Sequence, residues 1–114
     1  MIAVVDDDPE VLDSFRFLLE LSGYEVAIYS SAVAFLADDF DRLSCLILDH
    51  HMPQMSGLQL AAKLRAQGSS LPILLITGSS APALDAQATR VGIDKVLEKP
   101  VGEEDLMQFV TAHL

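Results

Sequence analysis

The sequence predicts an α/β fold, a three-layer, doubly wound (βα)5 arrangement in which helices cover both faces of a five-stranded parallel sheet. Three observations lead to this prediction. Short apolar runs without polar alternation recur along the chain, as expected for strands buried on both faces. Each run is followed by a segment with helical apolar spacing. The 114 residues, 51% of them hydrophobic, suffice for one core and exclude a disordered chain.

The first unit carries a clear helix-start signal. Residues 2–5 form an apolar strand, and Asp8-Pro9 follows with Asp8 as the expected N-cap and Pro9 at the first helical position. Gly23 is a suitable stop for this helix. Its expected apolar stripe consists of Val11, Leu12, Phe15, Leu18 and Leu19.

The second and third units are predicted in the same way. Residues 26–29 form the second strand, and Ser30 or Ser31 caps the next helix. The apolar residues expected on that helix are Val33, Phe35, Leu36 and Phe40. Residues 46–48 form the third buried strand, and Gly68 ends the helix that follows. The apolar positions of the third helix are Leu58, Leu60, Ala61 and Leu64.

Two further units complete the chain. Residues 72–76 are expected as the fourth strand and residues 82–91 as a weaker fourth helix. Residues 95–97 form the fifth strand, and residues 102–113 form the last helix. That helix is expected to turn Leu106, Phe109 and Val110 inward. We therefore expect one domain over residues 1–114.

Three carboxylates stand where the first and third strands stop. In open parallel sheets, ligands bind at the carboxyl ends of the strands, which directs attention to Asp6, Asp7 and Asp49. Crowded carboxylates repel one another unless a cation compensates their charge. Helix capping needs only one acid, and Asp8 can provide it. The remaining acids predict a hard divalent cation, and Mg²⁺ is favoured over Ca²⁺ because few protein ligands are present.

The fourth and fifth strands end in Thr77 and Lys99. The Lys99 ammonium is either solvated or paired with the strand-end carboxylates. The Thr77 hydroxyl either caps the following turn or bonds an anion. Pro100 predicts a turn after Lys99, with a cis peptide bond as one option.

Charge and cysteine content exclude several classes of protein. With 17 acidic residues against 7 Lys and Arg, the formal net charge is −10, which disfavours direct binding to nucleic acid or to an anionic membrane. The apolar runs are far shorter than the roughly 20 residues of a membrane-spanning helix. The single cysteine, Cys45, is expected in the core, and the chain is expected to be cytoplasmic. The acids expected to form solvated surface clusters are Asp38, Asp39, Asp41, Glu103, Glu104 and Asp105.

Four separated motifs give the chain a specific resemblance. They are residues 4–8 (Val-Val-Asp-Asp-Asp), 48–57 (Leu-Asp-His-His-Met-Pro-Gln-Met-Ser-Gly), 77–78 (Thr-Gly) and 98–100 (Glu-Lys-Pro). With them, the chain resembles the response-regulator receiver domain, the CheY-like family, over essentially its whole length. Residues 31–36 and 52–57 look most like the FixJ-type subgroup. The resemblance implies the flavodoxin-like strand order 2-1-3-4-5.

The resemblance also implies roles for the strand-end residues. Asp49 matches the acid that accepts a phosphoryl group from a sensor histidine kinase. Asp6 and Asp7 match the pair that holds Mg²⁺ with Asp49 and with the backbone carbonyl two residues beyond it, here that of His51. Such a domain is a two-component switch that controls an output partner or domain. It takes part in its own phosphorylation and dephosphorylation and is not a conventional enzyme.

The switch residues match the family in part. Thr77 matches the hydroxyl residue that moves to bond the phosphoryl oxygens, and Lys99 matches the lysine that neutralises them. Val96 departs from the aromatic residue often found there, so signalling is expected to depend on Thr77 and the fourth helix. His50 and His51 are a second departure. They are either solvated, or His51 tunes phosphoryl lifetime, or its ring joins the acids in a transition-metal site.

Several alternatives stay open beside the phosphoacceptor switch. A haloacid-dehalogenase-type phosphatase needs an Asp two residues after its nucleophile, where His51 stands. A flavodoxin-like cofactor binder needs a phosphate loop where the three acids stand. A receiver used only as an interaction module needs none of the strand-end set. The chain is either a stand-alone receiver or the N-terminal part of a longer regulator. The family also implies a homodimer through the fourth helix, fifth strand and fifth helix.

Overall fold

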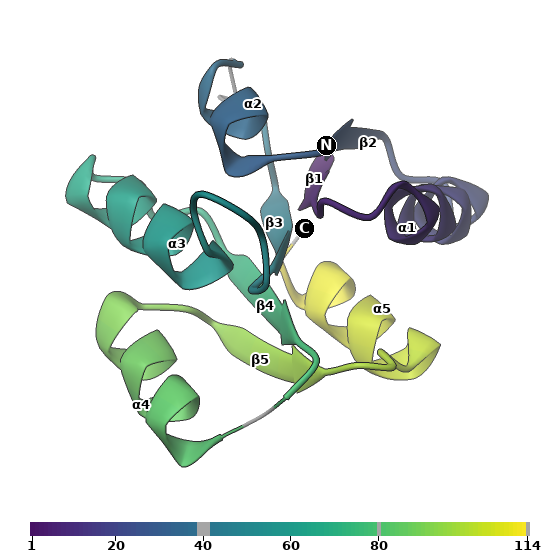
Figure 1. The fold of residues 1–114 in the computed structure, drawn as a ribbon. Coiled ribbons are helices and arrows are strands. Elements are labelled where there is room, and N and C mark those ends of the chain that lie inside the picture. The colour runs from purple at the N-terminus through teal and green to yellow at the C-terminus, as the bar shows by residue number, and fades with distance from the viewer. Residues whose placement is uncertain (39–41, 80, 114) are drawn as a thin grey trace.

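The computed structural model describes residues 1–38, 42–79 and 81–113, and within them strands and helices alternate as predicted (Figure 1). The strands are β1 (Ile2–Val5), β2 (Val26–Tyr29), β3 (Cys45–Asp49), β4 (Ile73–Thr77) and β5 (Lys95–Glu98). The helices are α1 (Pro9–Leu21), α2 (Ala32–Leu36), α3 (Gly57–Ala66), α4 (Pro82–Val91) and α5 (Glu103–Ala112). All four strand pairings are parallel, and the sheet order β2-β1-β3-β4-β5 confirms the fold class and its strand order.

Helices cover both faces of the sheet. Helices α1 and α5 lie on one side, and α2, α3 and α4 lie on the other (Figure 1). Successive residues of a strand point to opposite faces, so Ala3 and Val5 join one apolar cluster while Ile2 and Val4 join the other. This explains why β1 is apolar at every position. On the inner face of α5, Leu106, Phe109 and Val110 are buried, as predicted.

The helix-start signals have the predicted effect. The Asp8 carboxylate accepts a hydrogen bond from the Glu10 amide at 2.9 Å, and the Ser31 hydroxyl accepts one from the Ala34 amide at 3.0 Å. The choice between Ser30 and Ser31 is therefore settled in favour of Ser31. Cys45 is buried as predicted, and burial raises the pKa of its thiol to about 11.

The second helix is shorter than predicted. Helix α2 ends at Leu36, with Ala37 as its C-cap, and its residue Val33 is 57% exposed. Phe35 is fully buried and, together with Ala32, joins this short helix to the core. The expected position of Phe40, like those of Asp39 and Asp41, lies outside the described residues. In the part of the chain that is described, no helix combines the length and apolar character needed to cross a membrane.

Candidate functional site

The parallel register brings the polar strand ends to one edge of the sheet. Val5 pairs with Leu48, which places Asp6 beside Asp49, and Asp49 itself pairs with Ile76, the residue before Thr77. Asp6 is 2% exposed, Asp49 is 3% exposed, and Thr77 is fully buried. Burial of a polar group is costly unless it is compensated, so this edge differs chemically from the rest of the core.

The three predicted acids form a single cluster. Oxygen atoms of Asp6, Asp7 and Asp49 lie within 4.8 Å of one another. One Asp6 oxygen accepts a hydrogen bond from the Asp8 amide at 2.9 Å, whereas the partner of the buried Oδ1 of Asp49 is the Lys99 ammonium, 3.2 Å away. An oxygen-only donor set suits a hard divalent cation, and Asp7 is exposed, which leaves the cluster open to solvent.

Lys99 supplies the positive charge at this cluster. Its ammonium nitrogen lies 3.2 Å from Asp49 Oδ1 and 3.9 Å from Asp6 Oδ2. Partial burial alone lowers the pKa of Lys99, but the carboxylates of Asp49, Asp6 and Asp7 outweigh it and raise the pKa above its ordinary value. The Lys99–Pro100 peptide bond is cis, the option that the sequence left open. Lys99 is therefore paired with the strand-end acids and charged.

Asp6 shows the electrostatic strain of the cluster. Its pKa is raised from 3.8 to about 6, chiefly because burial disfavours the charged carboxylate. The neighbouring charges of Asp49 and Asp7 raise it further, and the Asp8 amide and Lys99 oppose them. Lys99 alone does not neutralise three acids, so the cluster has a deficit of positive charge that a cation would fill.

Thr77 and His51 make a contact of their own beside the cluster. The Thr77 hydroxyl donates to the Ser79 carbonyl at 3.1 Å and accepts from the Ser79 amide at 3.2 Å. Nε2 of His51 lies 3.2 Å from the same hydroxyl oxygen. Among the described residues, the His51 ring is not part of the metal-capable group, which is formed by the acids alone, so the transition-metal alternative finds no support.

Comparison with known proteins identifies the family to which this fold belongs. The family model described as the response regulator receiver domain matches residues 2–111. The chain belongs to the response regulator receiver domain family. Among curated proteins, this receiver is 40% identical to the response regulator protein TmoT of Ectopseudomonas mendocina, with 100% of this chain and 52% of TmoT covered. It is 37% identical to the transcriptional regulatory protein FixJ of Bradyrhizobium diazoefficiens, with 96% and 54% covered.

Solved structures agree with this assignment. The receiver superposes on the crystal structure of FixJ-N with a TM-score of 0.88 at 30% identity, covering 99% of this chain and 94% of that one. It superposes on the chemotaxis protein CheY4 of Vibrio cholerae with a TM-score of 0.90 at 28% identity, covering 99% and 97%. The predicted family and its FixJ-like character are thus confirmed. The chain spans about half the length of the curated relatives it matches.

The loop after β3 contains features of the receiver that the sequence prediction missed. Ser56 and Gln59 form a reciprocal capping box at the start of α3, with bonds of 2.9 and 3.2 Å between each side chain and the other's amide. The Ser-x-x-Gln spacing could have revealed it. Gly57 donates its amide to the His50 carbonyl at 3.0 Å. These contacts hold the loop that carries His51.

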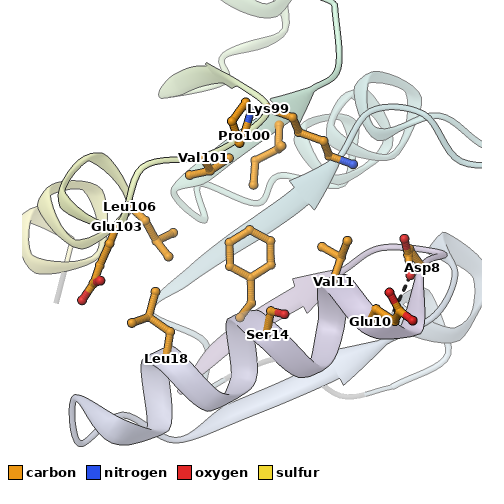
Figure 2. Close-up of a pocket in the computed structure, with 12 residues that line it drawn as sticks. Asp8, Glu10, Val11, Ser14, Leu18, Lys99, Pro100, Val101, Glu103 and Leu106 are labelled. Atoms are coloured by element: carbon orange, nitrogen blue, oxygen red, sulfur yellow. Dashed lines mark hydrogen bonds between the residues drawn. The ribbon is translucent and has the colours of Figure 1, made fainter.

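A groove runs along the receiver beside the acid cluster rather than over it. It has a volume of about 630 Å³ and lies between α1 and the segment that leads from β5 into α5 (Figure 2). Val11 and Leu18 line the α1 side, and Pro100, Val101 and Leu106 line the opposite side. Lys99, which pairs with Asp49, also lines this groove, so the groove adjoins the acid cluster.

Proposed function

We propose that this receiver domain accepts a phosphoryl group on Asp49 from a sensor histidine kinase, in the presence of Mg²⁺. Domains of this family are the receivers of two-component signal transduction. The observation that carries the proposal is the position of the buried Asp49 carboxylate, 3.2 Å from the Lys99 ammonium and clustered with Asp6 and Asp7. A nucleophilic carboxylate, a cation and a metal-capable pair of acids are what phosphoryl transfer to a side chain needs.

The chemistry follows from these positions. An Asp49 oxygen attacks phosphorus, a P–O bond forms, and the bond from phosphorus to the donor breaks. Lys99 lies where it offsets the charge that the arriving phosphoryl oxygens bring. Asp6, Asp7 and Asp49, with the backbone carbonyl of His51, would hold the Mg²⁺. When bound, the metal supplies further charge stabilisation at the phosphoryl oxygens.

The proposed response to phosphorylation starts at Thr77. A phosphoryl group on Asp49 adds charge and acceptor oxygens next to the end of β4. Thr77 would turn its hydroxyl to these oxygens and shift the loop that leads into α4. Val96 packs against the apolar cluster beneath that helix and has no aromatic ring to move. We therefore expect the signal to pass through Thr77 and α4 alone.

The wider context of the domain belongs to the same proposal. We expect a cytoplasmic phosphoprotein that serves a longer regulator, because the matching relatives are about twice as long. FixJ is named a transcriptional regulatory protein, so control of transcription through an attached domain is the proposed output. The net charge of −10 argues that this domain itself does not bind DNA. A homodimer through α4, β5 and α5 remains part of the proposal.

Intact mass measurement tests the function directly. The protein is incubated with acetyl phosphate and Mg²⁺, and we expect the mass of one added phosphoryl group. If the metal is chelated before the reaction, no phosphoryl group should be added. Asp49→Ala should gain none, whereas Asp13→Ala, which removes an exposed acid from α1, should behave as the wild type. A phosphoryl group that persists in Asp49→Ala would contradict the assignment of Asp49. No modification of the wild type would favour a pure interaction module.

A further inference from the structure

The hydroxyl group of Thr77 has every hydrogen-bonding position occupied. A hydroxyl offers one hydrogen and two lone pairs. The hydrogen points to the Ser79 carbonyl at 3.1 Å, and one lone pair accepts the Ser79 amide at 3.2 Å. The remaining neighbour is Nε2 of His51 at 3.2 Å. The tautomer with the proton on Nε2 satisfies all three contacts at once, because Nε2 then donates to the second lone pair.

The position of the His51 ring is supported from its other side. The rings of His50 and His51 pack edge to face, with centroids 4.9 Å apart and an interplanar angle of 64°. His50 is held in turn by its main chain, which donates to the Ile76 carbonyl at 2.8 Å and accepts from the Gly57 amide at 3.0 Å. The His51 donor is therefore presented to Thr77 by a loop that is tied to β4 and to the start of α3.

This arrangement conflicts with the role proposed for Thr77. To donate to a phosphoryl oxygen on Asp49, the hydroxyl has to withdraw its single hydrogen from the Ser79 carbonyl and turn toward Asp49. Rotation of the hydroxyl oxygen also breaks the bond from His51, which spans 26 positions of the chain and comes from the loop after β3 instead of the β4–α4 loop. Each of these bonds therefore stabilises the resting orientation.

We propose that His51 is a positioning residue that holds the Thr77 hydroxyl in its resting orientation, and that its bond to Thr77 must break when the domain is activated. This inference rests on the proposed function, because it assumes that Thr77 responds to a group on Asp49. It assigns the His51 side chain a role separate from that of its backbone carbonyl. His51 thereby sets how much binding energy a phosphoryl group must supply before the domain switches.

Beryllofluoride, which mimics a phosphoryl group on a carboxylate, tests the inference at a single pH with Mg²⁺ present. The variant His51→Leu keeps the backbone carbonyl but removes the donor. The net value of one hydrogen bond predicts that it binds beryllofluoride about three- to tenfold more tightly than the wild type. His51→Gln retains an N–H donor at similar reach and should restore affinity toward that of the wild type. His113→Leu, which replaces the histidine at the end of α5, is the matched control and should not change the affinity.

A double-mutant cycle shows whether the effect passes through Thr77. In a Thr77→Ala background, the difference between His51 and Leu at position 51 should vanish. A difference that persists would overturn the inference, since His51 would then act without the hydroxyl. Weaker binding by His51→Leu would also overturn it, because His51 would then contact the anion itself.

Nuclear magnetic resonance of the resting protein examines the bond without any activity. We expect the His51 ring to carry its proton on Nε2, with an exchange-protected signal that is lost in Thr77→Val and on addition of beryllofluoride. A ring protonated only on Nδ1 would overturn the inference. If the wild type binds no beryllofluoride, the proposed function fails, whereas equal affinities of the wild type and His51→Leu would refute the His51 role alone.

Discussion

The main chain of Gly57 lies directly against the carbonyl of Asp49. A β-carbon built at position 57 would overlap the Asp49 carbonyl oxygen and would come within 2.8 Å of Leu75 Cδ1 and 2.9 Å of His50 Cα. Two of these three neighbours are backbone atoms of the strand end, which cannot move without disturbing the site. The start of α3 and the proposed phosphoacceptor are therefore packed as one unit.

This contact predicts the result of a single-methyl substitution. Gly57→Ala should lower the free energy of unfolding by about 1–3 kcal/mol, because the added methyl group overpacks a site bounded by backbone. Urea unfolding followed by circular dichroism measures it. Gly78→Ala is the matched control, since a β-carbon at position 78 meets nothing within 4 Å. Equal free energies of unfolding for the two variants would show that the start of α3 shifts to accommodate the added methyl group at little cost.

The raised pKa of Asp6 predicts how stability depends on pH in metal-free protein. The folded-state pKa of about 6 lies above the ordinary value of 3.8, so between these values the folded protein binds more protons than the unfolded chain. The free energy of unfolding contributed by Asp6 should thus fall by about 2–3 kcal/mol as pH rises from 4 to 7.

Chemical denaturation across this pH range, with chelator present, gives the measurement. Asp6→Asn keeps an acceptor for the Asp8 amide but cannot ionise, so its stability relative to the wild type should increase with pH. Burial and the neighbouring His51 lower the pKa of His50, so the contribution of His50 to stability rises with pH and opposes that of Asp6. Because both proteins contain His50, this contribution cancels in the comparison. If the difference in the free energy of unfolding between the wild type and Asp6→Asn stays constant over this pH range, the pKa of Asp6 is not raised in the folded protein.

Arg65 connects α3 to the loop between α4 and β5. Its guanidinium donates to the Gly92 carbonyl at 2.9 and 3.3 Å and to the Ser69 carbonyl at 3.1 Å, and it lies 3.5 Å from an Asp94 oxygen. Arg65→Met should lower the free energy of unfolding by about 1–3 kcal/mol through loss of these charged hydrogen bonds.

Arg16 provides the comparison for Arg65. Its ion pair is an exposed contact of 3.5 Å with Glu20 one turn away, so Arg16→Met should lower the free energy of unfolding by no more than about 0.5 kcal/mol. Thermal and urea unfolding of both variants test the difference. If the two substitutions cost the same, the Arg65 bonds contribute nothing beyond a surface charge.

Asp7 should be essential for metal binding although it is exposed. Its oxygen belongs to the acid cluster, so Asp7→Asn should weaken Mg²⁺ binding by at least about tenfold, as measured by titration calorimetry. Asp13→Asn removes the same charge from the outer face of α1 and serves as the control. Similar affinities of both variants would mean that general negative charge, not the cluster, attracts the cation.

The alternation of apolar runs and helical spacing predicted the strands and helices well, because both signals are local. The Asp8-Pro9 start and the Ser31 cap were found where expected. The end of α2 was placed too late, since the apolar residues up to Phe40 continue the pattern while the structure ends the helix at Leu36. Apolar spacing shows that a segment can form a helix, but it does not fix the residue at which the helix ends.

The site was predictable as a set of residue types but not as a set of contacts. Asp6, Asp7, Asp49 and Lys99 could be placed together because parallel strands bring their carboxyl ends to one edge. Nothing in the sequence indicated that the His51 ring would reach Thr77. That contact depends on the path of the loop after β3, which is set by Gly57, Ser56 and Gln59.

By itself, the sequence determined the order of the strands and helices along the chain and the acids that stand where the first and third strands end. Periodicity of apolar residues and the rule that parallel strands share a carboxyl edge are enough for that. Only the tertiary structure decided which atoms pair there: Lys99 with Asp49, and His51 with Thr77. The reason is that hydrogen bonds act over about 3 Å, so loops far apart in the chain must first be packed into place.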